Sequence, residues 1–117
     1  MAIRCGTDIV FIPDMIKLFK DELMLKKLFH ADELSNPEIT SQRTSVSMEH
    51  LAGVLAAKEA FFKALGMVPK LHDIQIAYEP SGRPKIVVTP QWQKYKSCDV
   101  SISHDHNYAV AMVILEV

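Results

Sequence analysis

The first third of the chain is patterned as a strand followed by short helices. Residues Ile3–Ile12 are mostly small or β-branched, which predicts a strand, and the following Pro13 ends it. From Met15 to Phe29 the apolar residues recur at helical spacing, but two adjacent acidic residues interrupt them, so we expect two short helices. Ala31–Leu34 predicts one further helical turn.

The strongest helical pattern covers Met48–Leu65, which is rich in Ala and Leu. Ser47 is the candidate N-cap and Gly66 the candidate C-terminal cap. Four large apolar residues at helical spacing predict a buried stripe: Leu51, Leu55, Phe62 and Leu65. The preceding residues 35–47 are rich in Ser, Thr, Asn and Pro, which predicts a mobile loop.

The last third of the chain is patterned as strands. Four segments predict strands: Asp73–Tyr78, Lys85–Thr89, Cys98–Ser103 and Tyr108–Val117. The Pro and Gly residues of Pro80–Pro84 are typical of a turn, and residues 104–107 predict a tight hairpin connection. One strand, then helices, then four strands predicts an α+β fold. Its mostly antiparallel sheet packs against one long helix and short helices, in a single domain over residues 1–117.

Composition narrows the class of protein. Hydrophobic residues make up 49% of the 117 residues and charged residues 23%, which is ordinary for a folded domain. The net charge of −1 argues against a nucleic-acid-binding protein, and no apolar run approaches the roughly 18 residues of a membrane span. Without a signal-peptide pattern, the chain is expected to be a cytoplasmic enzyme or binding domain. Its small size allows only a shallow site, which a second subunit could complete.

Two carboxylates are candidates for chemistry. Asp8 lies inside an apolar strand, where an unpaired carboxylate costs several kcal/mol to bury. It could equally face solvent at the strand's end or pair with a lysine. Glu59 lies in the most apolar helix, where it could form a solvent-exposed i, i+4 ion pair with Lys63. Small neighbours of Glu59 would alternatively leave room for a ligand beside it: Ala56, Ala57, Ala60 and Ala64.

His104 is the third candidate, in a segment with a second histidine and an aspartate within three positions. Zinc usually takes four ligands, and the other candidates are far away in the sequence: Cys5, Cys98 and His72. Asp and Asn are also common in hairpin turns for backbone reasons, so the spacing disfavours zinc. The chain has no Walker loop, no G-x-G-x-x-G and no G-x-S-x-G motif.

Three segments together resemble one family. The strand GTDIV, the helix LAAKEAFFKALG and the hairpin SISHD are similar in order and spacing to the holo-[acyl-carrier-protein] synthase family of 4′-phosphopantetheinyl transferases. The resemblance runs over nearly the whole chain. It includes Leu28–Leu34, which is similar to the family's F-T-x-x-E segment, and the Gly82-Arg83-Pro84 turn.

The resemblance implies an activity. The enzyme would transfer 4′-phosphopantetheine from coenzyme A to a serine of an apo acyl carrier protein and release adenosine 3′,5′-bisphosphate. Mg²⁺ would be held by Asp8 and Glu59, a chemistry that suits a hard ion with water and phosphate oxygens in its other positions. The resemblance also implies a homotrimer with its sites between subunits. The implied catalytic residues are Asp8, Glu59, Lys63 and His104.

The same resemblance implies a set of coenzyme A contacts. Lys63 would meet a phosphate oxygen, and Lys58 would either contact the phosphates or form a structural ion pair. His104 matches the family's hairpin histidine at the coenzyme A site. Small and turn residues would shape the nucleotide pocket. The full implied set is Lys58, Lys63, Gly66, Gly82, Arg83, Pro84 and His104.

The chain departs from the family's pattern at several positions that bear on coenzyme A affinity and carrier docking: Phe11, Asp14, Val54, Leu55 and Asp105. Asp14 replaces a usual Arg on the helix that faces the acidic carrier. Lysines could still present a basic surface there, or serve solubility alone: Lys17, Lys20, Lys26 and Lys27. These departures leave a second reading open, a coenzyme A or carrier-protein binding domain without turnover. A third is a small structural α+β protein.

Overall fold

The computed structural model describes residues 1–35 and 45–117, with side chains from residue 48 onward in the second range. Residues 36–44 of the predicted loop lie outside the described residues. The elements in chain order are β1 (Ile3–Phe11), η1 (Ile12–Asp14), α1 (Met15–Leu18), α2 (Glu22–Leu28), α3 (Ala31–Leu34), α5 (Ser45–Leu65), η2 (Leu71–Asp73), β2 (Gln75–Tyr78), β3 (Pro84–Val87), η3 (Pro90–Trp92), β4 (Ser97–Asp105) and β5 (Tyr108–Glu116).

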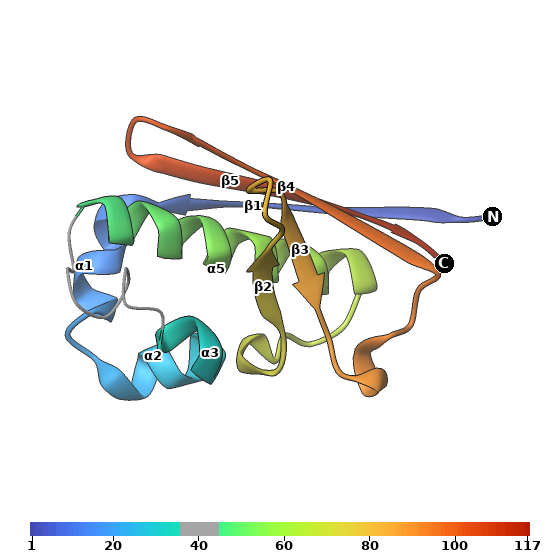
Figure 1. Ribbon diagram of the computed structural model, residues 1–117, viewed down its shortest axis with the longest axis horizontal. Helices are drawn as coiled ribbons and strands as arrows, with labels where there is room; N and C mark the ends of the chain where they lie inside the picture. The colour runs from blue at the N-terminus through green and yellow to red at the C-terminus, as the bar shows by residue number, and fades with distance from the viewer. Residues whose placement is uncertain (36–44) are drawn as a thin grey trace.

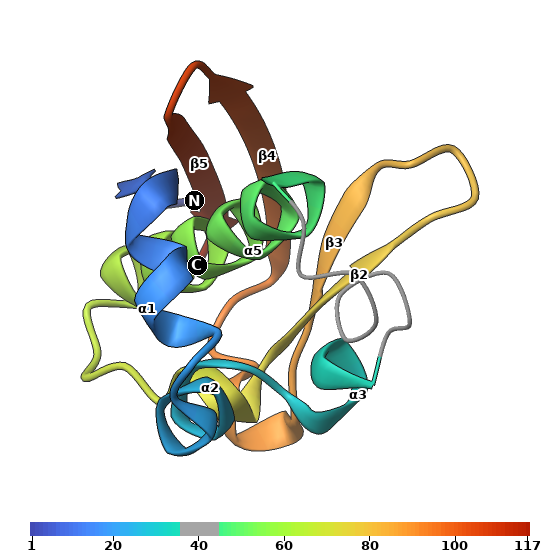
Figure 2. The same cartoon turned by 90° about the vertical axis from the view of Figure 1, so that its left-hand side faces the viewer.

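The strands form two antiparallel sheets, and the predicted α+β class is confirmed. Strands β1, β5 and β4 make a three-stranded sheet in that order, whereas β2 and β3 pair only with each other. Helix α5 lies along one face of the larger sheet, and the short helices lie on the far side of α5 (Figure 1). In the view turned by 90°, the β2–β3 hairpin projects away from β4 and β5 (Figure 2).

Helix α5 is buried on several sides, because the sheet covers one side and the short helices cover another. The predicted stripe is only half right: Leu51 and Phe62 are buried, but Leu55 and Leu65 are partly exposed. Small residues lie against the sheet instead, which lets helix and strand approach closely. At Gly6 of β1, an added Cβ would lie 2.0 Å from the carbonyl oxygen of Ala60.

Helix α5 differs from the predicted long helix at its start and agrees with it at its end. The helix begins at Ser45, earlier than predicted, so Ser47 lies inside it and is not the N-cap. Gly66 closes the other end with a φ of +71°, a conformation that glycine adopts without strain. The amides of Gly66 and Met67 both donate to the carbonyl of Phe62, at 2.9 and 3.2 Å, as helix C-caps of this kind require.

Local signals also explain the short helices. Asp21 breaks the helical pattern because its side chain accepts from the Met24 amide at 3.1 Å and caps α2. His30 caps α3, and the His30 amide in turn donates to Glu33 at 2.8 Å. The two short helices predicted between Met15 and Phe29 are therefore confirmed as α1 and α2.

The β4–β5 hairpin is longer than predicted. His104 and Asp105 belong to β4 and pair with β5, so the connection consists of His106 and Asn107 alone. His106 has a φ of +53°, the sign that two-residue hairpin turns need at their first position. The histidine that we placed in the turn therefore lies on a strand, and its backbone is fixed by the sheet.

The face of the larger sheet turned away from α5 is apolar on β1 and β5. Seven large apolar side chains on it are exposed: Ile3, Ile9, Phe11, Tyr108, Val110, Met112 and Ile114. The outward side of β4 is polar, with Ser101 and Ser103 facing the same way. Contiguous apolar surface of this kind typically marks an interaction site. Within the described residues, no helix is both long enough and apolar enough to cross a membrane.

Candidate active site

Asp8 and Glu59 approach each other between β1 and α5. The Asp8 side chain points toward α5, since its partner in the sheet is Ala111, which is buried against that helix. It is 18% exposed. Burial raises the pKa of Glu59, and the nearby Asp8 carboxylate raises that pKa further, while Lys63 lowers it in part. Two residues that lie far apart in the sequence thus share one electrostatic environment.

Lys63 completes this cluster. Its Nζ lies 3.2 Å from Oδ1 of Asp8 and donates to the carbonyl of Thr7 at 3.0 Å. The expected i, i+4 partner was Glu59, but among the described residues the salt bridge of Lys63 is to Asp8. Its side chain is 57% exposed, so the ammonium group can leave Asp8 for a bound anion at little cost.

The donor set of this cluster fits Mg²⁺. No three His, Cys, Asp or Glu side chains converge anywhere in the part of the chain that the structure describes. Mg²⁺ is commonly held by one or two carboxylates, with water and substrate phosphates in its other positions. Asp8 and Glu59 could supply two hard oxygen ligands at a partly exposed position, with room for those further ligands.

The small residues near Glu59 do not leave room for a ligand, which was one of the two alternatives for this position. The small residues of α5 pack inside the protein and are at most 3% exposed: Ala56, Ala57, Ala60 and Ala64. Their role is to let the sheet approach α5, as the contact between Gly6 and Ala60 shows. A ligand therefore reaches Glu59 from the solvent side. Sequence reasoning missed Gly6 as a determinant of this site, although it belongs to the GTDIV segment.

Lys58 is buried and points away from solvent. It is 0% exposed, and its ammonium group donates to Glu33 and to the carbonyls of Leu28 and Leu71, at 3.1 and 3.0 Å. These contacts match the structural ion pair, the second of the two roles predicted for this residue. Contact with coenzyme A would require a fully paired ammonium to leave its partners. Glu33 was missed as the partner, although it occupies the last position of the F-T-x-x-E-like segment.

His104 lies at the other end of α5. Its Nε2 is 3.0 Å from the carbonyl oxygen of Glu49, and the ring packs over Gly53. Glu49 precedes Glu59 by ten residues, which is about 15 Å along a helix with a rise of 1.5 Å per residue. Within one chain, His104 is therefore too far away to touch a metal ion held by Asp8 and Glu59.

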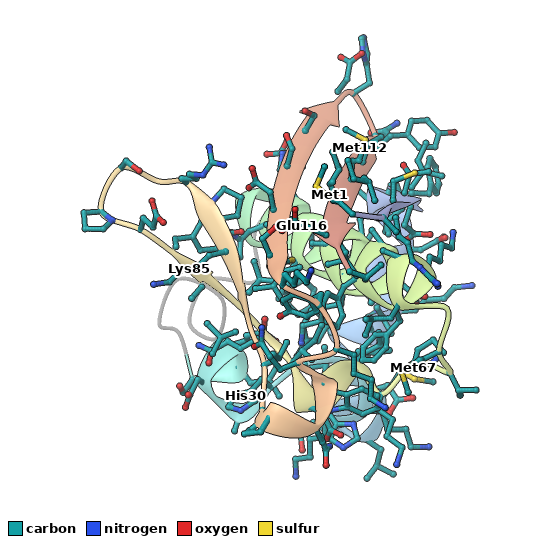
Figure 3. The ribbon with its side chains drawn as sticks, turned by 90° about the vertical axis from the view of Figure 1, so that its right-hand side faces the viewer. Met1, His30, Met67, Lys85, Met112 and Glu116 are labelled. Carbon is teal, nitrogen blue, oxygen red and sulfur yellow. The ribbon has the colours of Figure 1, made fainter. Side chains whose placement is uncertain are left out.

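The Gly82-Arg83-Pro84 turn lies beside β4. Gly82 has a φ of +90°, and its amide donates to the carbonyl of Glu79 at 2.8 Å, which fixes the turn. Nη2 of Arg83 lies 2.7 Å from both carboxylate oxygens of Asp99. Arg83 and Pro84 line a cavity of about 520 Å³ between the hairpin and the sheet. Lys85 and Glu116, labelled in Figure 3, lie on the hairpin side and the sheet side of this cavity.

The predicted site residues thus fall into two groups. Asp8, Glu59 and Lys63 gather at the β1 edge of the sheet, with Gly66 one turn further along α5. His104 and the Gly82-Arg83-Pro84 turn both lie along the opposite edge strand, β4, but the turn contacts Asp99 and His104 lies five residues further along. The structure brings the first group together and keeps the second group apart from it within one chain.

A match to a protein-family model identifies the superfamily of this chain. Residues 4–113 match the family model for the 4′-phosphopantetheinyl transferase superfamily. The chain is a member of that superfamily. Among its relatives is the holo-[acyl-carrier-protein] synthase of Geobacillus sp. (strain WCH70), 37% identical over 123 residues that cover 99% of this chain and 98% of the relative. That of Ehrlichia ruminantium (strain Welgevonden) is 36% identical and covers 98% and 97%.

Solved structures of superfamily members agree with the fold. The holo-(acyl-carrier-protein) synthase from Bacillus anthracis str. Ames in complex with CoA (3′,5′-ADP) matches with a TM-score of 0.81 at 27% identity and covers 98% of both chains. The enzyme from Neisseria meningitidis matches with a TM-score of 0.83 at 27% identity, over 97% of this chain and 98% of the other. The family resemblance predicted from the three segments is therefore confirmed.

The residues at which the chain departs from the family pattern lie in different parts of the structure. Phe11 packs against Tyr108, with ring centroids 5.4 Å apart, on the outward face of the sheet. Val54 is 1% exposed and belongs to the core. Asp105 pairs with His106 at 2.7 Å at the tip of the hairpin. Asp14 is exposed beside the first helix, where it lowers the positive charge of that surface.

Proposed function

We propose that this protein is an Mg²⁺-dependent holo-[acyl-carrier-protein] synthase that works through a single domain over residues 1–117. It transfers 4′-phosphopantetheine from coenzyme A to a serine of an apo acyl carrier protein and releases adenosine 3′,5′-bisphosphate. The observation that carries the proposal is the convergence of Asp8, Glu59 and Lys63 in a chain of this superfamily.

The residues of the cluster have distinct roles in this reaction. The serine oxygen bonds to the phosphorus that bears pantetheine, and the bond from that phosphorus to the bridging pyrophosphate oxygen breaks. Asp8 and Glu59 would hold Mg²⁺, which neutralises charge on the pyrophosphate when bound. Lys63 reaches the same position on a flexible, half-exposed side chain and donates to a phosphate oxygen.

The remaining predicted contacts would hold the nucleotide part of coenzyme A. Arg83 and Pro84 line the cavity beside the hairpin, and Gly82 belongs to the same turn. His104 lies further along β4, five residues beyond Asp99, the partner of Arg83. Gly66 ends α5 near the phosphate end of the site. We keep Lys58 out of this set, since all its hydrogen-bond donors are already paired inside the protein.

A homotrimer would join the two groups. The apolar outward faces of β1 and β5 give each chain a surface to bury against a second copy. Placing the β1 edge of one chain beside the β4 edge of the next is a head-to-tail contact, which closes into a ring when the rotation allows it. Each interface would then carry one complete site, with Asp8, Glu59 and Lys63 from one chain and His104 from its neighbour.

The carrier protein would dock on the basic surface of the short helices. Four exposed lysines lie on or beside α1 and α2: Lys17, Lys20, Lys26 and Lys27. Charge complementarity with an acidic carrier speeds association and sets orientation. A cytoplasmic location completes the proposal.

The proposal is tested by incubating the protein with coenzyme A, Mg²⁺ and several apo carrier proteins, followed by intact mass measurement of each carrier. The expected result is the addition of one phosphopantetheine group to at least one carrier, lost when EDTA replaces Mg²⁺. Coenzyme A binding without any mass gain across the panel would favour the second candidate, a binding domain without turnover. The buried Val54 and the acidic Asp14 are the departures that motivate that candidate.

A further inference from the structure

Two charged side chains are buried although the proposed reaction uses neither of them. Of the side chains that the structure describes, Lys58 is 0% exposed and Glu33 is 6% exposed. Burying two charges costs several kcal/mol each, and their attraction often does no more than offset that cost. The stability of the fold is therefore a weak explanation for the pair, and its position in the molecule is the more informative property.

The pair joins segments from across the chain. The three protons of the Lys58 ammonium have three partners, namely Glu33 of α3, the Leu28 carbonyl at the end of α2, and the Leu71 carbonyl of η2. Glu33 accepts in addition from the amide of His30 at 2.8 Å and from that of Ile76 in β2 at 2.9 Å. Lys58 thus ties α5 directly to three neighbouring elements, and Glu33 extends the connection to a fourth, β2.

The residue that follows Lys58 is the proposed metal ligand Glu59. Consecutive residues of an α-helix project about 100° apart, so fixing the direction of Lys58 also fixes that of Glu59. On the sheet side, α5 meets β1 through the small Gly6–Ala60 contact, which limits its distance from β1. The contact of Gly6 sets how far the helix lies from the strand, and the contacts of Lys58 set its rotation.

The rotation of α5 matters because a Mg²⁺ site tolerates only small displacements of its ligands. A carboxylate about 6 Å from the helix axis moves by about 2 Å when the helix turns by about 20°. Mg²⁺ demands near-ideal octahedral geometry with ligands at about 2.0–2.1 Å, so a shift of that size separates Glu59 from an ion on Asp8. A buried, fully hydrogen-bonded pair one residue away restrains the helix more tightly than exposed contacts would.

We propose that the Lys58–Glu33 pair is a positioning device that fixes the rotation of α5 and so aims Glu59 at the ion shared with Asp8. The inference rests on the proposed function, because it concerns the metal ligands of that reaction. It gives the last residue of the F-T-x-x-E-like segment a role in the site without any contact to substrate.

The test compares metal binding in matched variants without coenzyme A or carrier. The double variant Lys58→Met, Glu33→Gln removes both charges together and leaves no unpaired buried charge. The control is Leu115→Ala, a fully buried residue of β5 that lies four positions along the strand from the partner of Asp8. Both variants are expected to lower the melting temperature, since each disturbs the core. Mn²⁺ affinity, measured from the paramagnetic resonance signal of free Mn²⁺, distinguishes the double variant from the Leu115→Ala control.

The expected result is at least a tenfold loss of Mn²⁺ affinity in the double variant and less than a twofold loss in Leu115→Ala. A double variant that binds Mn²⁺ as tightly as wild type overturns the inference. A control that loses as much affinity as the double variant also overturns it, because general destabilisation would then be sufficient. If the double variant shows no cooperative melting, Glu33→Asp is measured in its place, because it keeps a charged partner for Lys58 but shortens the side chain that reaches it. The same tenfold loss is expected, and wild-type Mn²⁺ affinity again overturns the inference.

Holo-carrier formation by wild type, followed by intact mass, reports on the proposed function separately. Wild type that modifies the carrier while the double variant keeps its Mn²⁺ affinity leaves the function intact and refutes the positioning role alone. Wild type that modifies no carrier and binds no Mn²⁺ refutes both.

Discussion

Replacing Gly6 with alanine should damage the metal site from inside the fold. A Cβ at this position would lie 2.0 Å from the Ala60 carbonyl oxygen and 2.8 Å from the Ala64 amide nitrogen. Both atoms belong to the backbone of α5, so no side chain can rotate away. Real Cβ atoms stay beyond 3.0 Å of such atoms, so β1 and α5 must separate by about 1 Å.

The magnitude follows from that displacement. Forcing extra volume into a packed core typically costs 1–3 kcal/mol, which corresponds to a fall in melting temperature of about 10 °C for a domain of this size. A site must hold its groups within about 0.5 Å, so a 1 Å separation of Asp8 from Glu59 should also weaken Mn²⁺ binding by at least about tenfold. Thermal melting and Mn²⁺ titration of the same samples measure both effects.

Gly53→Ala is the matched control. Its added Cβ would meet side-chain atoms, Nε2 of His104 at 2.8 Å and Cγ2 of Ile102 at 2.9 Å, and these can move. Alanine is also favoured over glycine inside a helix by about 1 kcal/mol, which offsets part of the strain. We therefore expect Gly53→Ala to melt close to wild type and to keep its Mn²⁺ affinity. A Gly6→Ala protein with wild-type melting and wild-type Mn²⁺ affinity would refute the reasoning.

Three further predictions follow from the site and the outward sheet face. In the metal-free protein, burial and Asp8 raise the pKa of Glu59, so ionisation of Glu59 destabilises the folded state. The stability that neutral Glu59 allows is fully present below its unfolded-state pKa and is lost as pH rises through its folded-state pKa. Glu59→Gln should therefore melt a few degrees higher than wild type in EDTA at pH 7.5, with a smaller gain near pH 4.5; a gain that grows on acidification contradicts this. Lys63→Ala should weaken coenzyme A binding by about tenfold or more, measured by calorimetry, because a charged hydrogen bond is lost, but should change the melting temperature little. The ion pair with Asp8 would be its main role if the melting temperature fell while coenzyme A affinity stayed unchanged. Met112→Glu on the apolar outward face should shift the light-scattering mass toward the 13.2 kDa of one chain and abolish transfer; a trimeric, active variant would exclude that face as the interface.

Local signals in the sequence were sufficient for most of the elements. The acidic break at Asp21 and the helix-closing Gly66 each specify structure through neighbouring residues, and both predictions are confirmed. The strand predicted over Tyr108–Val117 is confirmed as β5. The start of α5 was placed too late, because Ser47 has the chemistry of a cap whether or not the helix continues through it. The sequence shows which residues can cap a helix. It does not show at which residue the helix begins, since that depends on tertiary packing.

Errors at the site have a common physical cause. The alanines beside Glu59 were compatible with open space for a ligand, yet they allow a close approach of the sheet, and only the fold distinguishes these two uses of a small side chain. Lys58 and Lys63 look alike in the sequence, but one is buried against Glu33 and the other is half-exposed beside Asp8. Helical periodicity indicates which residues share a face and not what covers that face. Long-range partners such as Glu33 follow from the tertiary arrangement alone.

The account depends on Glu59 of one chain and His104 of the next acting on the same coenzyme A. Complementation tests this directly: inactive Glu59→Ala and inactive His104→Ala proteins are mixed in equal amounts, partially denatured, refolded and assayed for holo-carrier formation by intact mass. In randomly mixed trimers, about a quarter of the interfaces combine an intact Glu59 with an intact His104, so activity should return to about a quarter of that of refolded wild type. A mixture that stays inactive while refolded wild type recovers would contradict the shared site.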